Sequence, residues 1–287
     1  MDQPGDTRPG QGAPEPPPTA FGSRAPRTKE DWKKTAGLVL ILAAVGWGLL
    51  FGGRWLAGEA VGWLPYDLDR GLGEAAADSM VEDSEVCTNP ELLEAVGSIV
   101  AQLESGLDDE YKPLKVHVVQ DEAINAFCLP GGYIFVLTGI LDEIERPEEL
   151  IGVLGHEIGH AVHRHGMKRI AKSVWFQFLI SQFSGGLDIG GSVILNMLTM
   201  SFDRDQERQS DTYGLELMNR VGYSARGFPD FFDRLPDHGV PEWLSTHPDP
   251  GDRAEELRKQ IEALSGGKPR VDPPPIAALK APCHRAD

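Results

Sequence analysis

Two histidines four residues apart, with a glutamate directly after the first, occur in the segment His156-Glu157-Ile158-Gly159-His160. On a helix, residues i and i+4 lie on the same face, so both imidazoles can bind one metal ion while Glu157 acts as a general base on the attacking water. This spacing predicts a zinc-dependent hydrolase, with His156 and His160 as metal ligands and Glu157 as a catalytic residue. The alternative is a pair of core histidines on an apolar helix.

Residues around this pentapeptide predict the helix that the geometry requires. Pro147 suits a first helical turn, Glu148 and Glu149 favour the positive end of the helix dipole, and Gly166 suits the end of the helix. The positions between them are apolar nearly all round, which is typical of a buried helix. A dry environment of this kind strengthens the electrostatics of a metal site.

A catalytic zinc site also needs a third protein ligand. The metzincin pattern would place a glycine three residues and a histidine six residues after His160, but the chain has His163 and Gly166 there. That class is excluded, and a carboxylate from a second helix is the remaining option. His163 and the following Arg164-His165 pair are interpreted as structural residues near the site rather than as ligands.

Residues 203 to 222 predict such a second helix, with Gly222 as its end. Glu207 and Asp211 lie four residues apart on one face of it, in line with an apolar stripe. Zinc would compensate the charge of Glu207, and the ring N–H of a metal-binding histidine would compensate Asp211. A solvated charged face, paired with neighbouring arginines, is the alternative.

Four motifs in this order resemble the M48 family of membrane-associated metallopeptidases. The pentapeptide and Glu207-x-x-x-Asp211 are preceded by residues 125 to 134 and followed by Thr246-His247-Pro248. The resemblance covers residues 86 to 265. One apolar span, described below, makes the layout similar to the Oma1 and BepA-like branch rather than to the multi-span HtpX and Ste24 branches.

The resemblance implies a zincin-type fold and a role for each residue. The two histidines of the pentapeptide and Glu207 would bind one zinc ion per subunit, Glu157 would carry a proton from the attacking water to the leaving amine, and Asp211 would support a ligating histidine. His247 would lie near the metal, where it either hydrogen-bonds the oxyanion as a second catalytic residue or occupies the fourth zinc position in a latent enzyme. A turn histidine without such a role is the alternative.

Residues 125 to 138 predict two short strands around the turn Pro130-Gly131-Gly132. An extended polypeptide can add to an exposed strand edge through main-chain hydrogen bonds, which demand little of its sequence. The resemblance likewise implies an edge strand that holds the substrate beside the metal. An ordinary core hairpin is the alternative. The candidate substrate-binding residues are Asn125, Ala126, Phe127, Gly131 and Gly132.

The 19 residues from Thr35 to Gly53 are uncharged and mostly apolar. As a helix they would be about 28 Å long, close to the roughly 30 Å of bilayer hydrocarbon. They show no amphipathic periodicity, so a soluble core helix is disfavoured. The segment and the leader before it are too long for a cleaved signal peptide, and one transmembrane signal anchor is predicted.

The basic residues that flank this span indicate its orientation across the membrane. Arg54 alone directly follows it, whereas the residues shortly before it include Arg24, Arg27, Lys29, Lys33 and Lys34. This asymmetry predicts a cytoplasmic N-terminus and a periplasmic or otherwise extracytoplasmic catalytic domain at the inner cell membrane. Residues 1 to 34 are proline-rich and predicted to be disordered. Residues 54 to 85 are expected to be a juxtamembrane linker, 86 to 265 the peptidase domain, and 266 to 287 a loose, proline-rich tail.

The net charge and the cysteine content limit which other functions are possible. The formal net charge of −17 repels nucleic acid, so no nucleic-acid partner is expected. Cys87 and Cys283 are predicted to form a disulfide in an oxidising compartment, while Cys128 lies in the predicted hairpin. Because Cys-x-x-Cys spacing does not occur in the sequence, a thiolate zinc site is excluded.

Residues 174 to 200 are apolar but interrupted by the glycine-rich segment 185 to 191, so they do not predict a second span. Two short helices joined by a glycine turn fit the pattern better. They could cover the cleft as a gate, rest on the membrane surface, or form part of the core.

The sequence therefore predicts a membrane-anchored zinc metalloendopeptidase. Its catalytic domain should be α+β and mainly helical, with a small antiparallel sheet beside the active-site helix. By resemblance, its polypeptide substrates would be misfolded or damaged envelope and membrane proteins. The alternatives are a chaperone-like polypeptide-binding module and a zinc amidase acting on the cell wall, since zinc geometry alone does not separate one amide from another. The sequence indicates no oligomeric state.

Overall fold

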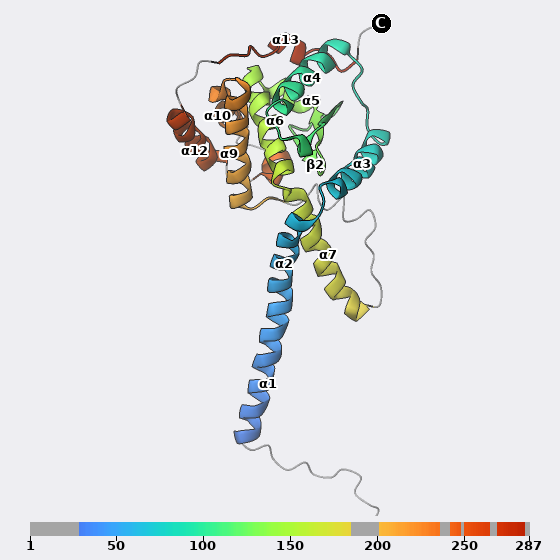
Figure 1. The fold of residues 1–287 in the computed structure, drawn as a ribbon, viewed down its shortest axis with the longest axis vertical. Helices are drawn as coiled ribbons and strands as arrows, with labels where there is room; N and C mark the ends of the chain where they lie inside the picture. The colour runs from blue at the N-terminus through green and yellow to red at the C-terminus, as the bar shows by residue number, and fades with distance from the viewer. Residues whose placement is uncertain (1–28, 185–200, 236–241, 248–249, 265–268, 285–287) are drawn as a thin grey trace, which may run out of the picture. The chain divides into compact units, whose positions relative to one another are not determined.

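The computed structural model describes residues 29–184, 201–235, 242–247, 250–264 and 269–284. Contacts divide the chain into two units, Met1–Trp47 and Gly48–Asp287. The described part of the first unit is one helix, α1 (Lys29–Trp47), and the other labelled elements belong to the second unit (Figure 1). The leader, residues 1–34, was expected to be disordered, but it is helical from Lys29 onward. Residues 1–28 lie outside the described residues.

One helical segment within the described ranges is long and apolar enough to cross a membrane, Ala36–Trp63, and its apolar 18-residue stretch has a mean hydropathy of 2.1. It includes the end of α1 and then η1 (Gly48–Gly52), α2 (Gly53–Ala60) and η2 (Val61–Trp63). Helical structure thus continues past the predicted limit at Gly53. The reason is that Arg54 interrupts the hydropathy but not the helix, and no proline follows until Pro65.

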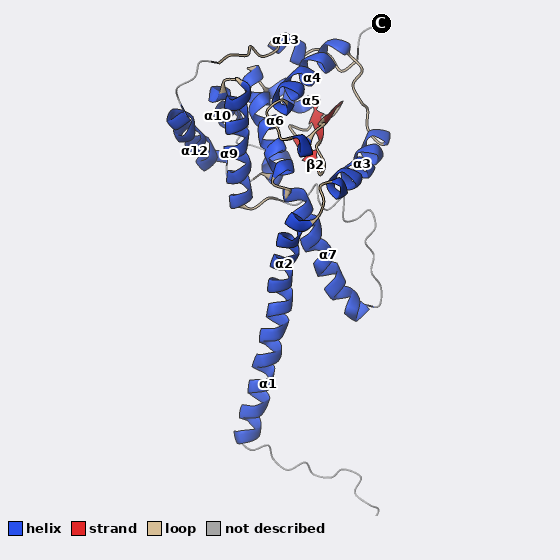
Figure 2. Cartoon of the chain, viewed as in Figure 1, coloured by secondary structure: helices blue, strands red, loops and turns tan. Residues whose placement is uncertain are grey.

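Three short strands form the sheet, in the order β1-β3-β2 (Figure 2): β1 (Lys115–Val119), β2 (Ala126–Leu129) and β3 (Tyr133–Leu137). β2 and β3 pair antiparallel as the predicted hairpin, but β1 pairs parallel with β3. The expectation of an antiparallel sheet is therefore corrected for β1, and the sheet is mixed. The short connection 120–125 crosses the end of β3, where the Thr138 hydroxyl donates to the Asp121 carbonyl at 2.9 Å.

The β2–β3 turn requires its two glycines, because Gly131 and Gly132 have φ values of 79° and 86°. A Cβ on Gly131 would also lie 2.5 Å from Cα of Arg70, at the start of α3 (Asp67–Glu82). The side chains of α3 that face the sheet pack against Leu129, Tyr133 and Phe135. The segment expected to be a juxtamembrane linker therefore contains two helices, α2 and α3.

Helix α6 (Pro147–Val162) runs through the core, and every residue from Glu149 to Ala161 is buried. It begins at Pro147 as predicted, but it ends before Gly166. His163 is the C-cap, and Arg164 adopts the left-handed conformation with φ 55°, so the turn occurs two residues earlier than the glycine suggested. The next helix, α7 (His165–Ser184), starts directly after this turn, which places Gly166 inside a helix.

The other helices of the second unit surround α6 and the sheet. Helix α9 begins with a capping box between Asp203 and Gln206 and ends at Gly222, whose φ of 93° suits glycine, as predicted. The core cluster joins side chains of α4, α6, α9, α10, α12 and α13 with the sheet. Their bounds are α4 (Pro90–Glu104), α5 (Thr138–Glu143), α9 (Arg204–Val221), α10 (Phe228–Arg234), α11 (Glu242–Thr246), α12 (Pro250–Leu264) and α13 (Ile276–Leu279).

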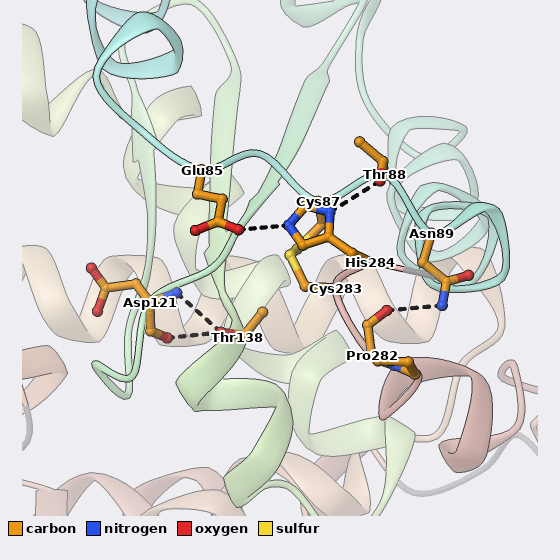
Figure 3. Close-up of a disulfide and its surroundings, with 9 residues drawn as sticks. All are labelled: Glu85, Cys87, Thr88, Asn89, Asp121, Thr138, Pro282, Cys283 and His284. Carbon is orange, nitrogen blue, oxygen red and sulfur yellow. Dashed lines mark hydrogen bonds and ion pairs between the residues drawn. A yellow bond between two sulfur atoms is a disulfide. The ribbon is translucent and has the colours of Figure 1, made fainter. Parts of the chain in front are cut away.

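The described part of the C-terminal tail, residues 269–284, is fixed to the domain rather than loose. Cys283 forms the predicted disulfide with Cys87, with a Cα–Cα distance of 4.6 Å (Figure 3). The carbonyl oxygen of Cys283 also accepts hydrogen bonds from the backbone N–H groups of Thr88 and Asn89, both at 3.0 Å. The prediction of a loose tail from its proline content was therefore wrong for these residues, and the backbone hydrogen bonds were not predicted because their partners lie almost 200 residues away.

Helix α7 is the first of the two short helices expected between residues 174 and 200, and it begins nine residues earlier than that segment. The glycine-rich turn and the second helix of the prediction lie outside the described residues, which resume at Ser201.

Candidate active site

The two helices that carry the predicted ligands, α6 and α9, approach each other backbone to backbone. A Cβ on Gly159 would lie 2.9 Å from Cα of Ser210, and a Cβ on Gly214 would lie 2.8 Å from the carbonyl carbon of Gly155. This close approach leaves no room for side chains between the helix axes. It therefore brings the polar side chains at the edge of the contact into direct reach of one another.

Four buried side chains meet at this contact: His156, His160, Glu207 and His247. One ligand atom from each lies within 4.8 Å of those of the others. Nε2 of His160 lies 2.9 Å from Nε2 of His156 and 3.3 Å from Oε1 of Glu207. Both histidines and the carboxylate that the sequence assigned to the metal are thus brought together.

This group of donors fits a zinc ion. Nδ1 of His156 lies 2.8 Å from Oδ1 of Asp211 and so carries its proton toward that carboxylate, which leaves the lone pair of Nε2 directed at the cluster. Converging lone pairs of imidazoles beside a carboxylate repel one another unless a cation lies between them. Tetrahedral zinc accepts nitrogen and oxygen donors of this kind.

Asp211 and Glu207 both contact the guanidinium group of Arg253, which was not predicted from the sequence. Arg253, on α12, is buried and donates to Oδ1 and Oδ2 of Asp211 at 2.7 and 2.8 Å, and its Nη1 lies 2.6 Å from Oε2 of Glu207. Burial alone would raise the pKa of Asp211, but Arg253 and His156 outweigh it and the pKa is lowered. Asp211 is therefore a carboxylate that both orients His156 and holds Arg253.

The pKa of Glu207 is likewise lowered. Burial acts to raise it, but His247, His160 and His156 outweigh that effect. Burial lowers the pKa of His160 well below its ordinary value. At neutral pH this side of the cluster therefore offers an ionised carboxylate and a neutral imidazole, which are the protonation states that bind metal.

Glu157 lies on the other side of the cluster, at a cavity. Its Oε1 is 3.4 Å from Nε2 of His247, and its Oε2 accepts a hydrogen bond from the backbone N–H of Cys128 in β2 at 3.2 Å. Burial raises the pKa of this carboxyl, and the neighbouring histidines oppose the effect. A buried carboxylate with a raised pKa beside a metal site suits transfer of protons to and from a reacting group.

The cavity has a volume of about 220 Å³ and is lined by Glu157, His247 and residues of the hairpin and of α7. Asn125 and Phe127, two of the candidate substrate-binding residues, line it, and so does Cys128, which was not a candidate. Ala126 is fully buried. Gly131 and Gly132 are not among its lining residues and instead pack against α3 and Leu114.

The outer edge of β2 faces Glu157. Strand β2 pairs with β3 on one side, and the N–H of Cys128 points away from β3 toward the Glu157 carboxylate. Backbone groups of alternate residues on an edge strand point outward together. Among the described residues, β2 is an edge of the sheet, and its outward N–H at Cys128 is bonded to Glu157.

His247 follows α11 and is held by an aromatic contact. Its ring stacks on Trp243 with centroids 4.7 Å apart, and its Nδ1 lies 3.0 Å from Oε1 of Glu207 and 3.2 Å from Nε2 of His156. Nδ1 thus lies among the metal donors while Nε2 faces Glu157. The histidine is therefore not the simple turn residue of the alternative interpretation.

Two other residues lie near the cluster: Arg253, which was not predicted from the sequence, and His165, which was predicted to be structural. Arg253 lies one turn before Leu257 on the apolar stripe of α12, and that position on a buried face was the available signal. His165 is buried with Nδ1 3.0 Å from Nδ1 of His160, and burial lowers its pKa to about 3. His165 is therefore a neutral partner of a predicted ligand, in agreement with a structural role.

The chain is similar in sequence to known proteins. The sequence profile of peptidase family M48 matches residues 89–261. A mitochondrial metalloendopeptidase OMA1 from Arabidopsis thaliana is 37% identical over 156 residues, which are 52% of this chain and 32% of that protein. OMA1 from Bos taurus is 33% identical over 183 residues, 56% of this chain and 35% of its own.

A bacterial relative shares more of the chain. A putative beta-barrel assembly-enhancing protease from Vibrio cholerae is 26% identical over 220 residues, which are 69% of this chain and 45% of that protein. The matched part thus spans less than half the length of each of these relatives.

Proposed function

The chain belongs to peptidase family M48. We propose that it is a zinc-dependent metalloendopeptidase anchored in a membrane by Ala36–Trp63. The main support for this proposal is the position of Glu157, between the buried donor cluster and the edge of β2. A module that only holds polypeptide needs no acid-base residue at that point.

The donors would be His156, His160 and Glu207, with Asp211 orienting His156. When bound, zinc lowers the pKa of water and polarises the scissile carbonyl. Glu157 takes a proton from the attacking water and delivers it to the leaving nitrogen. Its burial keeps bulk water away and raises its pKa, which helps the second of these transfers.

The substrate would be a polypeptide bound in extended form along β2. The outward backbone groups of β2 recognise main chain rather than side chains, so many sequences would be accepted. Asn125 and Phe127 line the cavity where flanking side chains would lie. Misfolded or damaged envelope and membrane proteins are the proposed physiological class, because they expose extended segments near a membrane.

The proposed location is the inner cell membrane, with the N-terminus cytoplasmic and the catalytic domain outside. The support is the excess of basic residues before the apolar segment and the disulfide between Cys87 and Cys283, which forms in oxidising compartments. The names of the relatives refer to mitochondria and to beta-barrel assembly. Both settings involve proteins of membranes.

The test compares wild type with Glu157→Gln on casein and on purified peptidoglycan, with zinc measured in each preparation. We expect cleavage of casein alone, and loss of that cleavage in the variant with zinc retained, because glutamine cannot carry the proton. Glu148→Gln, the same substitution in the first turn of α6, should keep full activity. Cleavage by the Glu157→Gln protein would refute the mechanism, and binding of casein without cleavage by wild type would favour the chaperone-like alternative.

A further inference from the structure

Helix α7 is divided along its length into a basic half and an uncharged half. Its basic residues, Lys168, Arg169 and Lys172, all lie in the first half, and no charged residue occurs from Ser173 to Ser184. No acidic residue occurs between Glu157 and Asp188. In a chain with a formal net charge of −17, this is an unusual local excess of positive charge.

The middle of α7 packs antiparallel against η1 and α2, within the second unit. The Trp175 indole N–H donates to the carbonyl of Leu49 at 3.1 Å, and a Cβ on Gly53 would lie 2.2 Å from the Trp175 ring. Nearer the start of α7, Lys172 packs over Gly58. Figure 1 shows α7 beside α2 over this stretch.

Hydrogen bonds connect the residues that follow α2 to the end of α6. Nη1 of Arg164 donates to the carbonyls of Val61 and Leu64, both at 2.7 Å, and its Nε donates to Asp69 at 3.1 Å. Arg164 directly follows the C-cap of α6. The contacts between the two segments therefore run from Arg164, bonded to the Leu64 carbonyl, to Trp175, which lies beside Gly53.

Large apolar side chains on this helix pair face outward. Phe176 is 50% exposed on α7, and Trp55 and Leu56 are 65% and 54% exposed on α2. Such a surface calls for an apolar environment. Since α2 belongs to the segment apolar enough to cross a membrane, lipid is the environment continuous with it.

Length and charge agree with that occupant. The uncharged run of the span ends at Gly53, so Trp175 lies at the level where hydrocarbon gives way to headgroups. The ten residues from Trp175 to Ser184 extend about 15 Å as a helix, which is close to half of a roughly 30 Å hydrocarbon layer. Lys168 and Lys172 lie above this level, where anionic headgroups attract basic side chains.

We propose that the second half of α7 is inserted into one leaflet of the bilayer beside the membrane span, with Lys168 and Lys172 among anionic headgroups. The domain is then held by two adjacent helices rather than by one. Because Gly166 and Arg169 of the same helix line the cavity beside Glu157, the cavity is kept next to the membrane surface.

The experiment places an environment-sensitive fluorophore on single cysteines in the full chain. The background is Cys128→Ser with the Cys87–Cys283 disulfide left intact. Phe176→Cys is the test position, Leu42→Cys in the span is the positive control, and Ser98→Cys, exposed on α4, is the matched negative control. The protein is reconstituted into vesicles of phosphatidylcholine and phosphatidylglycerol, with and without bromine on the acyl chains.

We expect bromine to reduce emission at Phe176→Cys at least twofold, as at Leu42→Cys, and to leave Ser98→Cys unchanged. An unquenched label at Phe176→Cys overturns the proposal. A blue-shifted but unquenched label also overturns it, because the helix is then covered by protein. The inference rests on the membrane anchor proposed above, and Leu42→Cys reports on that anchor separately.

Discussion

Asp211 connects the donor cluster to the rest of the domain because it accepts hydrogen bonds from both sides. It accepts from the ring of His156, and it accepts two hydrogen bonds from Arg253. Arg253 in turn faces Glu207. A change at Asp211 therefore alters the orientation of one ligand and the charge balance around another without removing any ligand.

We expect Asp211→Asn to weaken zinc binding by roughly 10- to 100-fold, because an amide no longer fixes the tautomer and orientation of His156. Competition with a chromophoric chelator measures the affinity. Asp205→Asn, at an exposed position in the first turn of the same helix, should bind zinc as wild type does. Equal zinc affinity in all three proteins would mean that Asp211 serves Arg253 alone.

His247 faces both of the tasks considered for it, and one substitution separates them. Its Nδ1 lies among the donors in the arrangement described, so we expect His247→Ala to open that position and raise casein cleavage severalfold. Initial rates at equal zinc content are the measurement. The control is His284→Ala, at a half-buried histidine whose ring bonds Thr88 and Glu85. A fall of tenfold or more with zinc retained would instead assign His247 to the oxyanion.

At the level of elements, glycines allow the close approach of α6 and α9. The pairs Gly155 with Gly214 and Gly159 with Ser210 leave backbone against backbone. The ligands on the two helices meet because the axes are this close. Helix packing and metal affinity should therefore respond to the same substitution.

A methyl group at position 214 tests this coupling. Gly214→Ala would put Cβ 2.8 Å from backbone atoms of Gly155 and His156, so the helices must separate. We expect the free energy of unfolding of the zinc-free protein to fall by about 1–3 kcal/mol and zinc affinity to fall with it. Chemical denaturation in detergent and chelator competition give the two values.

Gly97→Ala is the matched control, since a Cβ at this position of α4 meets nothing within 4 Å. It should leave zinc affinity unchanged and stabilise the protein by roughly 0.5–1 kcal/mol, because alanine favours a helix over glycine. Loss of stability at Gly214→Ala without loss of zinc affinity would separate packing from ligand placement.

Local signals predicted the elements that local chemistry decides. Pro147 marked the start of α6, Gly222 marked the end of α9, and the glycines of the turn marked the hairpin. The predicted end of α6 was wrong because Arg164 adopts the left-handed conformation, with its guanidinium bonded to the carbonyls of Val61 and Leu64. The parallel pairing of β1 depends on the path of a loop and leaves no periodic signal.

Ligand spacing within a helix was also readable, since i and i+4 share a face whatever the fold. The partner Arg253 was not predicted, because its role depends on which face of α12 meets α9, and no local pattern encodes that docking. The glycines at 155, 159 and 214 were visible in the sequence. Their role required knowing that the two helices touch.

At the scale of the whole molecule, the disulfide joins positions 196 residues apart. Closing so long a loop restricts the unfolded chain strongly. We expect Cys87→Ser combined with Cys283→Ser to lower the free energy of unfolding by about 2–5 kcal/mol. Denaturation with and without reductant checks this, and Cys128→Ser should show the full reductant effect. No difference between oxidised and reduced wild type would contradict it.

The same bond also governs what happens if the backbone is cut. The family match, residues 89–261, lies wholly between Cys87 and Cys283, and the membrane-span segment lies before Cys87. A protease nicked once inside this loop, by itself or by another enzyme, would keep both fragments in one molecule and both tethered to the membrane. Limited trypsin treatment should therefore give one full-size band without reductant and two shorter ones with it, while the Cys87→Ser/Cys283→Ser protein releases its distal fragment on denaturation.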